Sequence, residues 1–324
     1  MTQSGEPKNA LVRGNGTQLN LQRVPDSLHA AAKKGTYQRS VPYPEASIID
    51  DFAAEPFIGR GTRIATIGSC FAQELSGWLT RNDYNCLPNH WGVVYTPKSI
   101  EQIIRLSFED WHQELAEPFW VMNGHYYFPY IKAADHSGPL LLGDSENTAT
   151  DQLIRYIDTS RDALSHVDVL VLTLGLTELW RNKQDLSAFF AIPYPDVYQP
   201  EHHEFYSMTF DDVMSSLQYS IETLRKVNPG INILLSVSPI PLSVTFRDRL
   251  GPYVATQFSK SLLHTAALTT VHKYSHVHYM PSYEIVRNKP VEYYSEDGRH
   301  VTKECVGQVM AAFNKLYVEP DGVK

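Results

Sequence analysis

The sequence has little cysteine and no excess of basic residues. Three of its 324 residues are cysteines, at positions 70, 86 and 305, which is too few for a disulfide framework. Lysine and arginine number 28 against 36 aspartates and glutamates, and the formal net charge is −8. A nucleic-acid partner needs a clustered basic face, and none is present, so we expect no nucleic-acid binding.

Signals for membrane insertion and export are also missing. The longest apolar run ends at Leu174 and has the length of a strand, far below the roughly 18–20 residues of a membrane span. The polar N-terminus has no apolar stretch after a basic start, unlike a secretory signal. We therefore expect a cytoplasmic protein with free thiols and no membrane partner.

Metal and nucleotide motifs are absent as well. Two histidine groups lack the spacings typical of zinc ligands, namely His202-His203 and the set His272, His276 and His278. There is no phosphate-binding loop and no dinucleotide glycine pattern. We expect no metal site and no required cofactor.

The residues that are present describe a globular chain. Apolar residues make up 43% of the sequence and charged residues 20%, which suffices for a core. Beyond a polar extension over residues 1–61, strand patterns alternate with helical ones, and this alternation predicts an α/β domain over 62–324 with a parallel sheet. The strand patterns lie at Arg63–Ile67, Asp168–Leu174, Ile231–Val237 and Val277–Met280.

Two segments interrupt the alternation. The stretches near 107–150 and 181–212 are rich in tryptophan, tyrosine, histidine and proline, and we interpret them as insertions above the sheet. Some of their aromatic side chains, together with Trp91 before them, could stack on sugar rings, although most are expected to belong to the core. The candidates are Trp91, Trp120, Tyr126 and Trp180.

A glycine turn directly follows the first strand pattern. Gly68 permits a sharp turn, and Ser69 and Cys70 then open a helix whose free amide hydrogens can hold an oxyanion. A thiol at this place is acidified by the helix dipole, which suits a nucleophile. The alternative is a cysteine buried beneath the helix.

A second candidate lies before the last helical pattern. Asp297 and His300 form the only Asp-x-x-His of the chain. This spacing lets the carboxylate accept the imidazole Nδ1–H, which leaves Nε2 as a general base. The alternative is a solvated Asp-Gly turn.

Two further turns offer weaker candidates. Thr177 follows the Asp168–Leu174 run and could donate its hydroxyl to an oxyanion, while Gly92 could donate a backbone amide. Glu178 and Asn89 stand beside them and are candidate substrate-binding residues. Each turn could equally be an ordinary loop.

Taken together, these strand-end features resemble a known family. IGSCFA at 67–72 resembles the signature of the GSCFA family, which is related to SGNH or GDSL-like esterases and acyltransferases. The resemblance extends over about 62–312 and implies a three-layer α/β/α sandwich with a parallel sheet of about five strands. The other similar segments are NHWGVVYTP at 89–97, SVSPIPL at 236–242, FSK at 258–260 and YEIV at 283–286.

The resemblance also implies roles for the candidates. SGNH enzymes carry a serine nucleophile after the first strand, oxyanion donors after the second and third, and Asp-x-x-His near the C-terminus. Aligning the glycines places Cys70 at the nucleophile position and Ser69 one residue before it. Gly92 matches the second block, and Thr177 stands where an asparagine is expected.

The sequence therefore predicts acyl chemistry. The main hypothesis is an ester hydrolase that forms a covalent acyl-enzyme on Cys70 or Ser69, acting on an O-acylated carbohydrate or a related small-molecule ester. One alternative is an O-acyltransferase that uses acyl-coenzyme A (acyl-CoA) as co-substrate to modify a polysaccharide precursor. Another is a catalytically silent scaffold that binds a carbohydrate or a partner.

Overall fold

The structure is a computed structural model that describes residues 13–14, 17–18, 52, 54–133, 138–287 and 293–320. The chain divides into two compact units, Met1–Phe52 and Ala53–Lys324. In the first unit, β1 (Arg13–Gly14) pairs antiparallel with β2 (Thr17–Gln18). Residues 54–61, predicted to belong to the extension, lie in the second unit, where Ile58 is fully buried and pairs with Val318.

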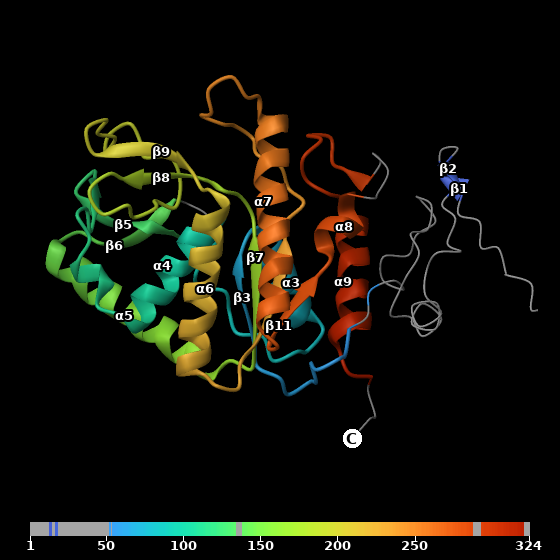
Figure 1. The fold of residues 1–324 in the computed structure, drawn as a ribbon. Coiled ribbons are helices and arrows are strands. Elements are labelled where there is room, and N and C mark those ends of the chain that lie inside the picture. The colour runs from blue at the N-terminus through green and yellow to red at the C-terminus, as the bar shows by residue number, and fades with distance from the viewer. Residues whose placement is uncertain are drawn as a thin grey trace, which may run out of the picture. The chain divides into compact units, whose positions relative to one another are not determined.

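A parallel sheet forms the centre of the second unit (Figure 1). Its order is β11-β10-β7-β3, and the strands are β3 (Ile64–Gly68), β7 (Val169–Leu174), β10 (Asn232–Val237) and β11 (Val277–Met280). Every residue of β3 and β7 is buried, as expected for strands covered on both faces. The predicted parallel α/β fold is confirmed.

An irregular segment takes the place of a fifth strand. It bonds to the free edge of β3 at two points: Leu87 N–H donates to the Ile64 carbonyl, and Val94 N–H donates to the Gly68 carbonyl. In chain order the sheet then reads 2-1-3-4-5, a doubly wound order whose switch point lies between β3 and β7. Ligands bind at such a point, outside the carboxyl ends of the strands.

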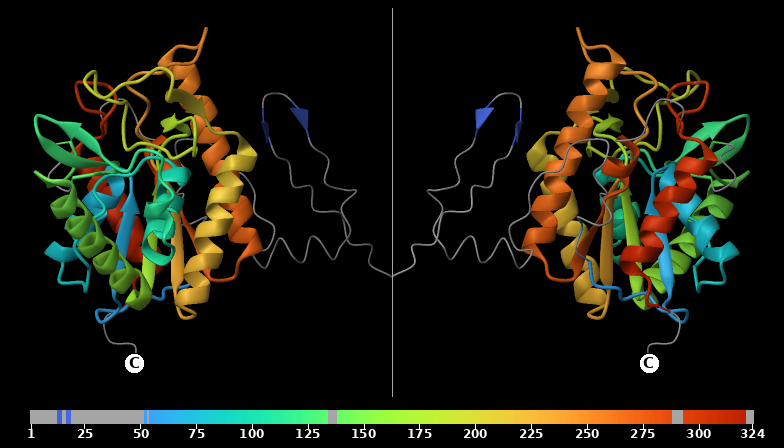
Figure 2. Two further views of the ribbon diagram at one scale, coloured as in Figure 1. Left: turned by 90° about the vertical axis from the view of Figure 1, so that its left-hand side faces the viewer. Right: turned by 90° about the vertical axis from the view of Figure 1, so that its right-hand side faces the viewer.

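Helices cover both faces of the sheet (Figures 1 and 2). One layer contains α4 (Pro97–Phe108), α5 (Glu146–His166), α6 (Phe210–Val227) and α7 (Pro252–Lys273). The other contains α3 (Cys70–Arg81), α8 (Ser282–Arg287) and α9 (Lys303–Tyr317). The predicted start of α4 is confirmed, because Thr96 accepts from Ser99 N–H and Pro97 takes the first helical position.

The two predicted insertions contain strands that the sequence did not indicate. After η2 (Trp111–Gln113), the first insertion forms an antiparallel sheet of β4 (Trp120–Met122), β5 (His125–Lys132) and β6 (Pro139–Gly143). The second contains β9 (His203–Ser207), which forms a hairpin with β8 (Glu178–Asn182), a strand that begins before residue 181. Figure 1 shows both sheets on the same side of the central sheet as α4 and α6.

Candidate active site

A pocket of about 320 Å³ opens at the carboxyl ends of the central strands. Ser69 and Cys70 follow β3, Gly175 and Leu176 follow β7, and Ser238 follows β10. The wall is completed by residues of β5, β8 and β9, by segments 93–96 and 238–246, and by Arg299 and His300. Its lining is largely apolar and aromatic, as ligand pockets usually are.

The turn after β3 brings Cys70 to this pocket. Gly68 has φ +140°, and a Cβ there would lie 2.3 Å from the Thr173 carbonyl oxygen, so glycine is required. Ser69 is buried, and its Oγ lies 2.9 Å from Thr173 Oγ1, while its N–H donates to the same hydroxyl. Cys70 is half-buried and takes the first position of α3, where a backbone N–H has no helical acceptor.

Sequence reasoning missed two residues that line this pocket, Tyr95 and Arg299. The Tyr95 hydroxyl neighbours the Cys70 thiol, and burial first, then the thiol, raises the pKa of Tyr95 to about 12. The positive charge of Arg299 lowers the pKa of Tyr95 and so opposes part of this rise. Tyr95 belongs to the NHWGVVYTP segment and Arg299 to the Asp-x-x-His turn, so both lay within segments already singled out.

The Asp-x-x-His turn has the predicted internal hydrogen bond. His300 Nδ1 lies 2.5 Å from Asp297 Oδ2, and His300 lines the pocket together with Cys70. Asp297 Oδ1 accepts from the N–H groups of Arg299 and His300, at 2.9 and 3.0 Å. These backbone bonds, followed by the imidazole, lower the pKa of Asp297 to about 2. The carboxylate is thus fixed as an acceptor, and the ring keeps Nε2 available.

Glu178 lies in the pocket wall, but its charge is already engaged. Its Oε1 accepts from Thr245 Oγ1 at 3.0 Å and lies 3.2 Å from Arg247 Nε. Burial raises the pKa of Glu178, and Thr245 and Arg247 act against that rise. The residue therefore joins β8 to the segment 243–247 at the mouth of the pocket.

Thr177 is not among the residues that line the pocket. It is fully buried, and its Oγ1 lies 2.6 Å from Ser259 Oγ, which also accepts from Thr177 N–H. Next to Ser259, the fully buried Lys260 donates from Nζ to the Gly175 carbonyl at 2.6 Å. Burial lowers the pKa of Lys260 to about 7. The turn after β7 is thus held by α7.

Gly92 and Asn89 also lie outside the lining of this pocket. Gly92 has φ +66°, and a Cβ there would lie 2.4 Å from the Lys132 carbonyl oxygen. Asn89 stabilises the same turn, since its Oδ1 accepts from Trp91 N–H and its Nδ2 donates to the Gly92 carbonyl. The structure brings Ser69, Cys70, Glu178 and His300 to one pocket, whereas Asn89, Gly92 and Thr177 do not line it.

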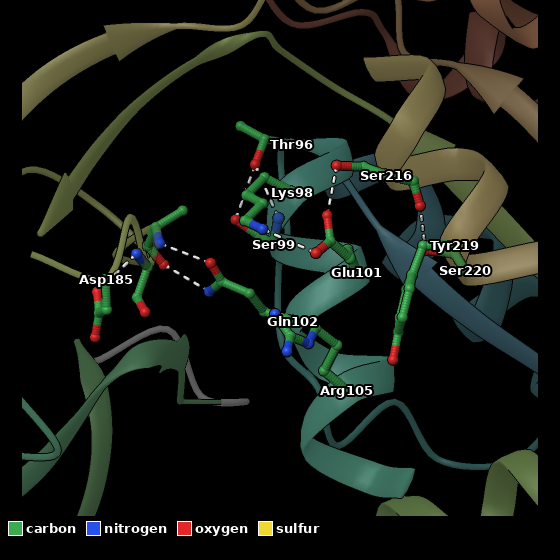
Figure 3. Close-up of polar contacts among 12 residues, drawn as sticks. Thr96, Lys98, Ser99, Glu101, Gln102, Arg105, Asp185, Ser216, Tyr219 and Ser220 are labelled. Atoms are coloured by element: carbon green, nitrogen blue, oxygen red, sulfur yellow. Dashed lines mark hydrogen bonds and ion pairs between the residues drawn. The ribbon is translucent and has the colours of Figure 1, made fainter. Parts of the chain in front are cut away.

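Helix α4 anchors the aromatic side of the pocket. Thr96 and Ser99, at its start, line the pocket and bond to each other through their hydroxyls. In Figure 3, Gln102 points from α4 toward the segment that contains Asp185. Gln102 accepts from Ala188 N–H at 2.6 Å and donates to the Ala188 carbonyl at 2.9 Å. These bonds fix the start of the segment 189–192, all of which lines the pocket.

The aromatic candidates for sugar stacking separate into two groups. Trp91 and Trp120 are buried in the core, and Tyr126 lies on β5 outside the pocket lining. Trp180 lines the pocket, and its ring is 5.1 Å from that of Phe246. Within the described ranges, no group of three or more metal-binding side chains is present. No helix in the same ranges is long and apolar enough to span a membrane.

Comparison with solved structures finds distant likenesses. A Clostridium thermocellum family 3 carbohydrate esterase is 12% identical, with a TM-score of 0.33, covering 79% of this chain and 94% of that one. The periplasmic domain of a Salmonella ser. Paratyphi A lipopolysaccharide acetyltransferase is 10% identical, with a TM-score of 0.34 and coverages of 79% and 84%. An acetyl esterase variant with acetate ion is 11% identical, with a TM-score of 0.35 and coverages of 78% and 93%.

Comparison with curated protein sequences gives no significant match. The model of one protein family, described as the GSCFA family, matches residues 63–313. This match includes the central sheet and every residue named at the pocket. The predicted resemblance is thereby confirmed, and the chain belongs to the GSCFA family.

Proposed function

We propose that the protein is an acyl-ester hydrolase that works through a covalent acyl-enzyme on Cys70. The observation that carries the proposal is the shared pocket: a thiol at a helix start and a histidine oriented by a carboxylate both line it. Nucleophile, base and orienting acid are the parts that nucleophilic acyl transfer requires.

The reaction proposed has two halves. Cys70 Sγ attacks the ester carbonyl carbon and its proton passes to His300 Nε2, so a C–S bond forms. The C–O bond then breaks, and the leaving alkoxide takes that proton. In the second half His300 removes a proton from water, the hydroxide attacks the thioester, and the C–S bond breaks to restore the thiol. Asp297 holds the imidazole in the required tautomer throughout.

The backbone N–H of Cys70 is the proposed oxyanion donor, because it begins α3 without a helical acceptor. Loss of one such donor typically costs about 3–4 kcal/mol. Gly92 and Thr177 were predicted as further donors, and we disfavour them because neither lines the pocket. We favour Cys70 over Ser69 as nucleophile because the Ser69 hydroxyl is buried against Thr173.

Turnover of p-nitrophenyl acetate tests the proposal. We expect Cys70→Ala to lower kcat/KM by about 10³-fold or more, since a covalent route loses its nucleophile. Cys86→Ala is the matched control: this half-buried thiol does not line the pocket, and its loss should leave kcat/KM within about twofold. Wild-type protein that turns over no ester would support the catalytically silent binding scaffold instead.

Transfer to a sugar hydroxyl is the second candidate, with acyl-CoA as donor. The observation in its favour is the thiol itself, because acyl exchange between two thioesters is nearly isoenergetic. Trp180 and Phe246, at the pocket, could stack on a sugar ring. Acetylation of Cys70 by acetyl-coenzyme A, followed by faster loss to an added polysaccharide precursor than to water, would identify the transferase. No acetylation together with rapid ester cleavage would leave the hydrolase.

A further inference from the structure

Charges are unevenly compensated in the pocket. Among its described lining residues, Glu178 is the only carboxylate, and its charge is engaged by Arg247. Two cationic side chains, Lys132 and Arg299, line the same pocket. The cavity therefore carries positive charge without an equal number of free carboxylates among the residues described.

Arg299 is partly buried, and the described contacts give its guanidinium few acceptors. Its Nε is shielded from solvent and has no hydrogen-bond partner, and its Nη2 reaches only the Pro241 carbonyl, at a long 3.4 Å. The neighbouring Asp297 accepts from the Arg299 backbone N–H, and no ion pair between its carboxylate and this guanidinium is present among the described contacts. A ligand in the pocket that supplies oxygen acceptors to the Nη groups of this guanidinium therefore gains charge-assisted hydrogen bonds.

The position of Arg299 sets where that acceptor would lie. The residue stands inside the Asp-Gly-Arg-His turn, next to His300. Its charge acts on Tyr95, which in turn neighbours Cys70. An anion bound by Arg299 would therefore sit close to the reacting thiol, with the apolar wall of Leu176 and Phe190 available to the remainder of the ligand.

We infer that the pocket selects acyl esters carrying an anionic group, a carboxylate or a phosphate, which Arg299 binds with Lys132 as a second cation. The inference rests on the proposed function only in taking the ligand to be an ester. Arginine suits this role because its planar donors match both kinds of oxyanion. Neutral esters of the same size would bind without satisfying the guanidinium.

Alkylation of Cys70 tests the charge preference without any turnover. Iodoacetate is anionic and iodoacetamide is neutral, and the same thiolate attacks the CH2 carbon of either reagent and displaces iodide, so the thiolate fraction cancels in the ratio of the two rates. Peptide mass spectrometry reads Cys70 separately from Cys86 and Cys305. We expect Arg299→Met to lower the iodoacetate-to-iodoacetamide ratio at Cys70 by about fivefold or more, and Arg299→Lys to retain most of it.

Arg155→Met is the matched control. Arg155 is exposed on α5 and does not line the pocket, so this variant removes one positive charge from the protein and should leave the ratio unchanged. An unchanged ratio in Arg299→Met overturns the inference, and so does an equal fall in Arg155→Met. A wild-type protein that turns over no ester would contradict the proposed function. The alkylation ratio would still test the charge preference, because it requires no turnover.

A second measurement uses the unmodified protein, in case Arg299→Met does not fold. Butyrate, glycerol phosphate and neutral butanol are compared as protectants of Cys70 against iodoacetamide. We expect at least one anion to protect at about fivefold lower concentration than butanol. Stronger protection by glycerol phosphate identifies a phosphate ligand, and stronger protection by butyrate identifies a carboxylate. Equal protection by all three compounds overturns the inference.

Discussion

The turns that follow β3 and β7 lie side by side at the edge of the central sheet, yet their polar groups have opposite surroundings. After β3, Ser69 bonds to Thr173 and Cys70 is left facing the pocket. After β7, the Gly175 carbonyl is bonded to Lys260, and both the N–H and the hydroxyl of Thr177 are bonded to Ser259. One turn offers a reactive group to a ligand, and the other is satisfied within the protein.

The difference originates in α7 rather than in the turns themselves. Ser259 and Lys260 come from a helix about eighty residues after Thr177 in the sequence. Their side chains hydrogen-bond to the Thr177 N–H and hydroxyl and to the Gly175 carbonyl, which are then not available to a ligand. Cys70, by contrast, lines the pocket, and the Tyr95 hydroxyl beside its thiol is also part of the pocket lining. A polar residue at a strand end thus becomes a candidate for chemistry only if the rest of the fold leaves it open to a ligand.

The largest expected effect concerns the base that serves the first turn. His300→Ala should lower kcat/KM for p-nitrophenyl acetate by about 10³-fold or more, because nothing then takes the thiol proton. His166→Ala is the control, since His166 is exposed and also pairs with an aspartate, Asp162, away from the pocket. Near-normal activity of His300→Ala would show that the turn after β3, like the turn after β7, has only a structural role.

Asp297→Asn should have the next largest effect, a fall in kcat of about 10²–10⁴-fold, because the imidazole tautomer is no longer fixed. The pKa of Asp297 is about 2, so its carboxyl stays ionised as pH falls to about 3 and protonates only below that. A pH–rate profile between pH 4 and 9 should therefore show no step from Asp297. An acid limb that disappears specifically in Asp297→Asn would contradict this assignment.

Lys260→Met tests the second turn through stability. Burial lowers the pKa of Lys260 to about 7, whereas an unfolded lysine titrates near ~10.4. Between these values the unfolded chain binds a proton that the folded chain does not, so the stability contribution of Lys260 rises with pH above about 7 and is lost again as pH falls toward it.

Urea unfolding at pH 7 and pH 9.5 measures this dependence. We expect the stability of Lys260→Met relative to wild type to fall by roughly 3 kcal/mol between the two pH values. Lys273→Met, at the exposed end of the same helix, should show no such change. A pH-independent difference for Lys260→Met would mean that Lys260 stays charged inside the protein.

The smallest expected effect on activity is that of Thr177→Val. Its hydroxyl faces Ser259 and does not line the pocket, so kcat should change by less than about threefold. Stability should fall by about 1–3 kcal/mol, because Ser259 Oγ loses a partner in a buried place. Adding Ser259→Ala to Thr177→Val should lower the stability by little more, because the Ser259 hydroxyl has already lost its partner. A fall in kcat near 10²-fold without loss of stability would instead make Thr177 an oxyanion donor.

Much of the fold could be predicted because its signals are local. The buried strands β7 and β10 are continuous apolar runs, and Thr96-Pro97 carries its own helix start. Helix α5 was missed because its inward face includes small or polar residues such as Ala149 and Ser160, which weakens the apolar repeat. Among the insertion strands, β4 and β9 were missed because they are short and only partly buried, and the eight-residue β5 was missed because its buried residues follow one another instead of alternating with exposed ones.

The candidate site was predictable to the same extent. Asp297 and His300 lie three residues apart in one turn, and Cys70 follows a required glycine, so short-range patterns were enough to find them. The partners of Thr177 and Glu178 come from segments that only the tertiary fold brings near. Arg299 is informative only through what it lacks, an acceptor for Nε, and a sequence cannot display a missing contact.

Acyl-enzyme trapping tests the central claim most directly. Wild-type protein is mixed with p-nitrophenyl acetate and quenched in acid within one turnover, and fragmentation of the peptide that spans Ser69 and Cys70 locates the acetyl group. The account predicts acetyl on Cys70, removed by neutral hydroxylamine as a thioester should be, and no adduct in Cys70→Ala. Acetyl on Ser69, or ester turnover with neither residue modified, would contradict it.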